Sequence, residues 1–229
     1  MKPNKEAADP LEAILTGIQE GDDIGGPTEI AKRLSHSLAK MQAFTPRDIS
    51  DRYLDWWRSG AFDTGPTFSM VFSRASQGMN QERAVRETDK LLDGATAGCN
   101  PAHRIAPMAA FSFIETENIP VFARTEARLT HWHEHAGDTA SIVALLCRFL
   151  VQGNDWPSSK ALAEKLDPRG WATVLSGKVS DRGHAPDVVK TAIHFLDLNA
   201  DLSEIKKFAG PANYSPVIFG VLKRLSTQV

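Results

Sequence analysis

The apolar stretch Ala140–Val151 is the feature that most constrains the fold of this chain. Asp138 and Thr139 are typical of a helix start, and the residues after them are apolar on nearly every side of the expected helix, apart from Ser141 and Arg148. A helix that is hydrophobic all round is surrounded by other elements. The sequence therefore predicts that this helix, opened by Asp138 and Thr139, lies at the centre of a helical core.

The rest of the chain repeats the helical pattern. Apolar residues recur at helical spacing in further segments that begin near residues 10, 28, 45, 80, 158, 186, 202 and 217. No segment shows the sustained alternation of β-branched residues that is typical of strands. The chain has 229 residues, 42% of them hydrophobic, which suits one domain with a sizeable core. We expect an all-α fold, a compact single-domain multi-helix bundle over residues 1–229, with residues 1–9 as a flexible polar lead-in.

Composition excludes several classes of protein. The formal net charge is -2, and Lys and Arg are scattered among Asp and Glu, which argues against a nucleic-acid or membrane-surface footprint. The two cysteines, Cys99 and Cys147, show neither disulfide-scaffold nor zinc-ligand spacing. The N-terminus is too polar for a signal peptide, and no apolar run reaches membrane-spanning length. These features lead us to expect a cytoplasmic protein.

The turn at residues 21–27, Gly-Asp-Asp-Ile-Gly-Gly-Pro, stands immediately before an expected helix. Asp22 and Asp23 place two carboxylates beside Gly25 and Gly26, which can adopt positive φ and leave backbone N–H groups uncovered. We expect the two aspartates to be catalytic and the two glycines to contact substrate. The alternative is an ordinary acidic loop that contains glycines.

The segment 59–67 is a second glycine-punctuated loop. Asp63 stands between Phe62 and a Thr-Gly-Pro turn, so we expect it to project from a partly buried loop as a third catalytic carboxylate, with Thr64 and Gly65 against the substrate. The alternative is an Asx turn or a cap for the next helix.

The segment 98–107 brings an amide, an imidazole and a guanidinium together between glycine and proline. We expect Asn100, His103 and Arg104 to bind substrate. A buried Arg104 needs a carboxylate or phosphate partner, because an unpaired buried charge is very costly.

Three histidines alternate at residues 131–135. Residues two apart point to different sides of a helix, and none of the usual helical zinc spacings is present, so we do not expect a metal site there. We expect His131 to face a ligand or to cap a helix.

The last irregular segment, residues 210–216, supplies Asn213, Tyr214 and Ser215 as further substrate contacts before a final apolar helix. All these polar loops precede helix starts. Helix N-termini offer unpaired N–H groups, so several that converge on one pocket would suit an anionic ligand.

The irregular segments occur in an order that resembles a known family. Residues 21–25 look like its Gly-Asp-x-x-Gly motif, and residues 53–65 look like its next block, with Tyr-x-x-Trp and Phe-Asp-x-Gly. Residues 98–107 resemble Gly-Asn-Gly-x-x-Met-Arg-x-x-Pro, and Thr130-His131 is similar to the Thr-His pair before the long buried helix. The family is that of the ADP-ribosylglycohydrolases, which includes the dinitrogenase-reductase-activating glycohydrolase.

The resemblance implies an all-helical fold that cleaves an N- or O-glycosidic bond of ADP-ribose, with two magnesium or manganese ions held by a Thr-Asp-Asp segment and an Asp-x-Asp-Thr segment. Both metal segments are altered here. The early position reads Gly25-Gly26-Pro27, and the late one reads Pro211-Ala212-Asn213-Tyr214-Ser215, with no Asp. Asp22, Asp23 and Asp63 could still hold one Mg²⁺. We therefore predict that the two-metal centre is absent or reduced.

Three functions follow as hypotheses. The first is an ADP-ribosyl or related nucleoside-sugar glycohydrolase that acts on an ADP-ribose-like small molecule or an ADP-ribosylated target. The second is a catalytically inactive ADP-ribose-binding or regulatory module. The third is a fold recruited to another task, in which Cys99, Asn100 and His103 replace the family's Asn, Gly and Met. Cys99 is then either a nucleophile assisted by His103 or a buried structural thiol.

Overall fold

Side-chain caps set the beginnings of several helices. The Asp9 carboxylate accepts a hydrogen bond from the backbone N–H of Leu11 (3.0 Å), and the Asn80 side chain accepts one from the N–H of Arg83 (3.3 Å). Each cap satisfies one of the N–H groups that a helix start leaves without an intrahelical partner. The computed structural model describes residues 9–227, and most predicted helix starts lie at or close to the observed ones.

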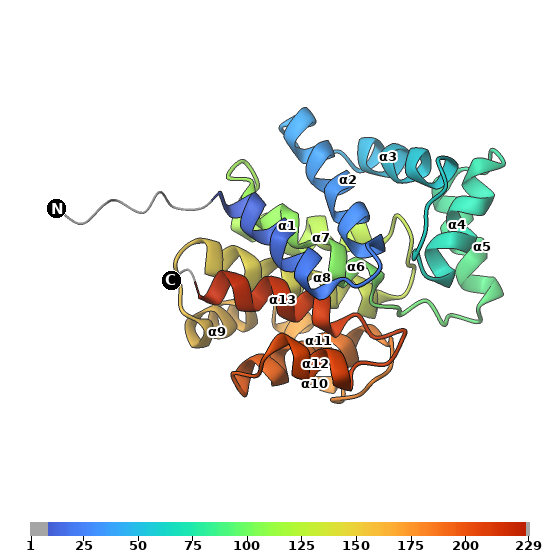
Figure 1. Ribbon diagram of the computed structural model, residues 1–229. Helices are drawn as coiled ribbons and strands as arrows, with labels where there is room; N and C mark the ends of the chain where they lie inside the picture. The colour runs from blue at the N-terminus through green and yellow to red at the C-terminus, as the bar shows by residue number, and fades with distance from the viewer. Residues whose placement is uncertain (1–8, 228–229) are drawn as a thin grey trace.

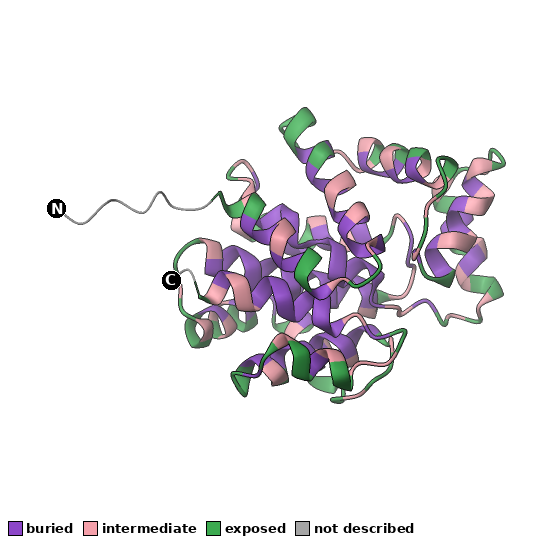
Figure 2. Ribbon diagram, viewed as in Figure 1, coloured by how far each residue is buried: buried purple, intermediate pink, exposed green. Residues whose placement is uncertain are grey.

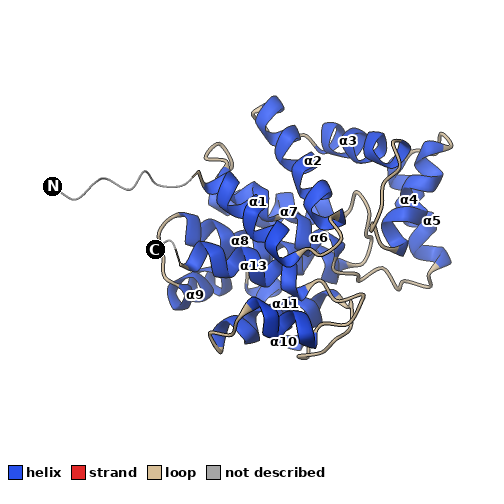
Figure 3. Ribbon diagram, in the orientation of Figure 1, coloured by secondary structure: helices blue, strands red, loops and turns tan. Residues whose placement is uncertain are grey.

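The described residues form α-helices and two short 3-10 helices, and they contain no strand (Figure 1, Figure 3). The helices are α1 (Pro10–Gly21), α2 (Gly26–Met41), α3 (Pro46–Arg58), α4 (Pro66–Ser76), α5 (Gln81–Leu91), α6 (Asn100–Arg104), η1 (Ala106–Ala110), η2 (Thr116–Asn118), α7 (Ile119–Ala127), α8 (Glu134–Val151), α9 (Trp156–Leu166), α10 (Pro168–Ser176), α11 (Ala185–Asp197), α12 (Leu202–Phe208) and α13 (Ser215–Ser226). The prediction of an all-α fold is confirmed.

Helix α8 lies at the centre of this arrangement, as predicted. Almost all of its residues are buried, whereas the outer helices alternate between buried and exposed faces (Figure 2). Its neighbours are α6, η1, α7, α9, α10, α11 and α13. The predicted start near Asp138 was wrong, because the His133 side chain accepts a hydrogen bond from the N–H of His135 (3.1 Å) and caps the helix at Glu134.

Helices α1 and α13 approach each other closely. A Cβ added to Gly17 would lie 2.6 Å from the Cα of Val221, and one added to Gly220 would lie 2.4 Å from the carbonyl oxygen of Gly17. Only glycine permits such backbone contact. Gly21 at the end of α1 also touches Pro216 at the start of α13, so the turn after α1 and the loop before α13 meet at one place.

Four helices, α4, α6, α7 and α10, were not among the predicted helical segments. Three of them, α6, α7 and α10, have only five or nine residues, and helices this short depend on contacts with distant elements. In α7, the Arg124 guanidinium contacts the carboxylates of Asp138 (2.6 Å) and Asp167 (2.8 Å). Such long-range ion pairs leave no periodic signal in the local sequence.

Two further expectations concern the ends of the chain and membranes. Of the predicted lead-in 1–9, all but Asp9 lies outside the described residues. In the described part of the chain, no helix is both long enough and apolar enough to cross a membrane.

Candidate functional site

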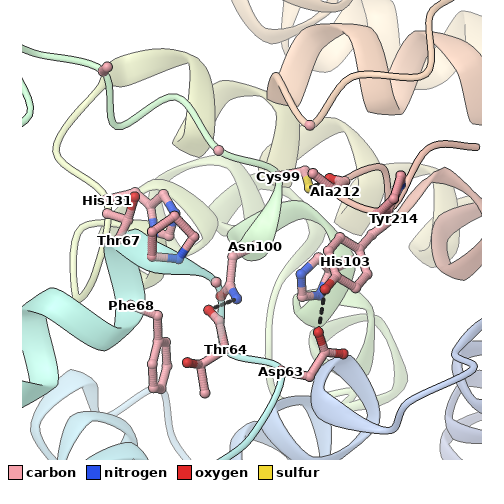
Figure 4. A pocket seen from close by; sticks show the side chains of 16 residues that line it. Asp63, Thr64, Thr67, Phe68, Cys99, Asn100, His103, His131, Ala212 and Tyr214 are labelled. Carbon is pink, nitrogen blue, oxygen red and sulfur yellow. Dashed lines mark hydrogen bonds between the residues drawn. The ribbon is translucent and has the colours of Figure 1, made fainter.

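Segments that are far apart in the chain meet around a cavity of about 350 Å³, called here the main cavity. It is lined by residues 63–68, by residues 98–100, by His103 and His131, and by the loop before α13. Figure 4 shows His131 beside Thr67 on one side and the pair Asp63 and Tyr214 on the other, with Asn100 between them. Cavities of this size and mixed polarity are typical of small-molecule sites.

Among residues 9–227, Asp63 supplies the one carboxylate that lines the main cavity. Its backbone is left-handed, with φ of 50°, and its Oδ1 accepts a hydrogen bond from the Tyr214 hydroxyl. Its Oδ2 is buried without a hydrogen-bond partner. Burial raises the pKa of Asp63 and the nearby Asp22 carboxylate raises it further, whereas the hydrogen bond from Tyr214 and the nearby backbone N–H of Gly26 act in the opposite direction. A half-buried carboxyl group of this kind is suited to proton transfer.

Gly26, the first residue of α2, holds the backbone of Asp63 in place. A Cβ on Gly26 would lie 2.4 Å from the carbonyl oxygen of Asp63 and 2.7 Å from its Cβ, so no other residue fits there without displacement. Gly25 caps α2 with φ of 110°. Neither glycine lines the main cavity, although both were expected to contact substrate; Gly26 acts on the site through Asp63.

Asp22 is bound to the start of α2. Its Oδ1 accepts a hydrogen bond from the N–H of Gly25 (2.7 Å), and its Oδ2 accepts from both the N–H (2.9 Å) and the hydroxyl (2.6 Å) of Thr28. These bonds satisfy N–H groups at a helix N-terminus, where a negative charge is also stabilised. The carboxylate therefore positions α2, and it reaches a second, adjoining cavity rather than the main one.

The second cavity, of about 270 Å³, lies on the other side of Asp63 and Tyr214, which line both cavities. Asp23 is exposed at its edge and forms an ion pair with the ammonium group of Lys206 (2.6 Å). Lys206 was not expected in the site, because its partner lies 183 residues away in the sequence.

Arg104 is fully buried and lies outside both cavities. Its guanidinium donates to the carboxylate of Glu126 (2.7 Å), to the side-chain oxygen of Asn100 and to the hydroxyl of Thr130 (2.9 Å). The expected carboxylate partner of Arg104 is thus Glu126, on α7. Asn100, which lines the main cavity, also donates to the backbone carbonyl of Thr64 (3.1 Å) and joins two walls of the cavity.

The hydrogen bonds around Arg104 favour one tautomer of His131. A guanidinium can only donate, so the Thr130 oxygen accepts from Arg104. The single hydroxyl proton of Thr130 then goes to its nearer acceptor, Nδ1 of His131 at 2.8 Å, rather than to the carbonyl of Ala127 at 3.4 Å. These distances favour the tautomer of His131 that carries its proton on Nε2, the nitrogen left for the cavity. Burial, with the charge of Arg104, lowers the pKa of His131 well below its usual range.

His103 and Cys99 occupy the wall next to Tyr214. The rings of His103 and Tyr214 lie 4.9 Å apart, and burial, with the adjacent charge of Arg104, lowers the pKa of His103 to about 3. Burial raises the pKa of the Cys99 thiol to about 11. A thiol of that pKa is almost wholly protonated near neutral pH, which favours the structural alternative for Cys99 over a nucleophile.

Asn213 and Ser215 hold the loop before α13. The Asn213 amide donates to the carbonyls of Ser180 (2.8 Å) and Arg182 (3.0 Å), and its oxygen accepts from the N–H of Ser215 (2.9 Å). Asn213 lines only the second cavity, and Ser215 lines neither. Both were expected to contact substrate, and the structure places them where they shape the loop that carries Tyr214.

The carboxylates of Asp22, Asp23 and Asp63 do not fit a two-metal centre, which needs several free oxygen ligands. Asp22 is bound to α2, Asp63 accepts from Tyr214, and Asp23 faces the positive charge of Lys206. Within residues 9–227, no group of three or more His, Cys, Asp or Glu side chains is arranged to hold a metal ion. The predicted loss or reduction of the centre stays a prediction.

Of the residues expected to form the site, seven lie together around the main cavity: Asp63, Thr64, Gly65, Asn100, His103, His131 and Tyr214. Sequence reasoning missed the cavity residues Thr67 and Phe68, at the start of α4. The substrate contacts expected from the loop 59–67 ended at Gly65, and nothing local marks the first turn of the following helix as cavity wall.

Comparisons with known proteins bear on the fold and the family of this chain. A search of curated proteins found no significant match. A solved structure described as an ADP-ribosylglycohydrolase-related protein complex is similar in fold, with a TM-score of 0.69 over 97% of this chain and 89% of that chain, at 19% sequence identity. The family model for ADP-ribosylglycohydrolase matches residues 6–211. The chain therefore belongs to the ADP-ribosylglycohydrolase family.

Proposed function

We propose that this protein is a glycohydrolase that cleaves an ADP-ribosyl or related nucleoside-sugar bond in the main cavity, without a complete two-metal centre. The observation that carries the proposal is the position of Asp63. Its carboxylate lies between two cavities, it has one oxygen without a partner, and burial raises its pKa. Membership of the family supports a glycohydrolase-like function.

The proposed reaction needs one carboxylate and one hydrogen-bond donor. Asp63 takes a proton from water, the water oxygen bonds to the anomeric carbon, and the glycosidic bond breaks through an oxocarbenium-like state. The leaving group departs with the bonding electron pair and takes up a proton from solvent, and Asp63 releases to solvent the proton that it accepted from water. The Nε2–H of His131, on the opposite wall, donates a hydrogen bond to a ribose or leaving-group oxygen (Figure 4).

The test is the release of free sugar product by the wild type and by Asp63→Asn. Asparagine tolerates the left-handed backbone of Asp63, so the variant should fold. Asp93→Asn is a matched control, because Asp93 is exposed and has the same φ of 50°. We expect at least a hundredfold loss of turnover in Asp63→Asn, in the range of general-base catalysis, and none in the control. A folded, fully active Asp63→Asn protein would refute the role of Asp63.

A second candidate is a catalytically inactive binding module that retains the cavity. It is favoured by the partners of the acidic groups: Asp22 is bound to α2, Asp23 to Lys206, and Asp63 to Tyr214. This candidate predicts saturable binding of a nucleotide sugar with no product from any ADP-ribosylated substrate. Product that appears in proportion to wild-type enzyme, and is lost with Asp63→Asn, excludes it.

A further inference from the structure

The charge of the main cavity points to a narrower class of ligand. Within residues 9–227, no Lys or Arg side chain lines this cavity, and its one acidic group is Asp63. Arg104 follows the lining residue His103 in the sequence, but its guanidinium is fully buried in an ion pair with Glu126. Arg182 precedes the lining residue Gly183 but does not line the cavity itself. A diphosphate would therefore meet a carboxylate and no cationic side chain.

The two imidazoles do not supply the missing positive charge. His103 and His131 are almost fully buried, and both stay neutral near pH 7 because burial and the charge of Arg104 lower the pKa of each ring. They act as neutral hydrogen-bonding groups. His131 offers Nε2–H, and Nδ1 of His103 is buried without a hydrogen-bond partner. Hydroxyl groups of a sugar suit such neutral partners better than phosphates do.

Apolar groups complete the wall. Phe68, Cys99, Ala212 and the ring of Tyr214 line the cavity together with the amide of Asn100. An apolar wall with a few polar groups is typical of a small-molecule site, and the polar side chains here other than Asp63 are neutral. The volume of about 350 Å³ lies at the lower end of the range for such sites.

We propose that the main cavity selects an uncharged glycoside of the nucleoside class over ligands that carry a phosphate or diphosphate there. This inference rests on the proposed function and narrows its substrate. A feature that could attract an anion is the start of α4, where the backbone N–H groups of Thr67 and Phe68 have no helical acceptor. The negative charge of Asp63 stands close to that helix start in the sequence and lines the same cavity.

Isothermal titration calorimetry of the full chain with adenosine, AMP and ADP-ribose tests the inference. We expect adenosine to bind at least tenfold more tightly than either charged probe. Ala212→Lys places a cation on an exposed wall position, where the fold should tolerate it, and should bring AMP within tenfold of adenosine or reverse the order.

ADP-ribose that binds the wild type as tightly as adenosine, or more tightly, would overturn the inference and show that α4 recruits phosphate. The proposed glycohydrolase could then still release product from an ADP-ribosyl substrate, and the product assay with Asp63→Asn would show this. If none of the three probes binds and no product forms from nucleosides or from ADP-ribosyl compounds, the inference and the proposed function both fail.

Discussion

At the scale of single residues, identical side chains have different roles because they have different partners. Asp22 and Asp63 were both expected to be catalytic, yet only Asp63 lines the main cavity. Both oxygens of Asp22 accept hydrogen bonds from groups at the start of α2, whereas one oxygen of Asp63 has no partner. The partners, rather than the residue type, separate a helix cap from a candidate catalytic base.

The Tyr214→Phe variant tests how the Tyr214 hydroxyl changes the pKa of Asp63. The Tyr214 hydroxyl donates to the Asp63 carboxylate and so lowers the pKa of that carboxyl group against the larger effect of burial. Loss of the hydroxyl should raise the pKa of Asp63, because the charged form loses a donor. The acid limb of the pH profile of kcat should then move to higher pH. An acid limb that stays in place would show that Asp63 is not the titrating base.

The Asp22→Asn and Asp22→Ala variants test the cap. Because each carboxylate oxygen accepts a backbone N–H, an amide would turn its NH₂ toward an N–H donor and would not restore the cap. We expect both variants to lose about 0.5–2 kcal/mol of unfolding free energy in urea titrations. Asp51→Asn, on the exposed face of α3, is the control and should change little. An Asp22→Asn protein as stable as the wild type would contradict this role.

At the scale of elements, the site depends on close contact between α1 and α13. These helices are the first and the last in the described chain, and their contact brings the turn at residues 22–25 against the loop that carries Tyr214. The contact is possible because Gly17 and Gly220 face each other with no side chain between the backbones.

Gly220→Ala should therefore destabilise the protein, although alanine favours helices by up to about 1 kcal/mol over glycine. Its Cβ would lie 2.4 Å from the carbonyl oxygen of Gly17, so one helix must shift. We expect a net loss of about 1–3 kcal/mol in chemical denaturation and weaker ligand binding. Equal or greater stability would show that the two helices separate without cost.

At the scale of the whole molecule, the sequence was sufficient to predict the fold class and most helices, because apolar periodicity and capping residues are local signals. The central place of α8 followed from its all-round apolar surface. The start of α8 at Glu134 and the helix α7 could not be predicted, because a histidine cap and long-range ion pairs stabilise them. Helix α10 does begin with a local signal that our prediction missed, Asp167 as a side-chain cap followed by Pro168.

The site was predictable only in part, for a related reason. The loop motifs indicated Asp63, Asn100 and His131, but the partners that define their chemistry lie far away in the sequence. Arg104 required a carboxylate, and nothing local named Glu126, which lies 22 residues further on. The positions of Lys206 and of the first turn of α4 at the site depend on how the helices pack together, so the local sequence did not predict them.

Buried neutral histidines should make the stability of the whole protein depend on pH. His103 and His131 have a lower pKa in the folded state than in the unfolded chain, so the unfolded state binds more protons. The two histidines contribute fully to stability above about pH 6.5, the pKa of histidine in the unfolded chain, and this contribution is lost as the pH falls. Between pH 6.5 and 5, unfolding free energy should fall by about 1.4 kcal/mol per pH unit for each such histidine.

Urea titrations at pH 7.5, 6.5 and 5.5 measure this dependence, and His131→Asn should show a smaller slope than the wild type. A stability that is flat across this range would contradict the burial of neutral imidazoles in the cavity wall.

The most direct test of the central claim, a ligand cavity at Asp63 that works without a complete two-metal centre, is thermal unfolding with adenosine or ADP-ribose in the presence of Mg²⁺ or of a chelator. A ligand at 100 times its Kd stabilises a protein by about 2.7 kcal/mol, which a melting curve resolves. We predict that at least one of the two raises the Tm equally with Mg²⁺ and with chelator. A rise in Tm that requires Mg²⁺ would contradict the account, and so would no rise with either ligand.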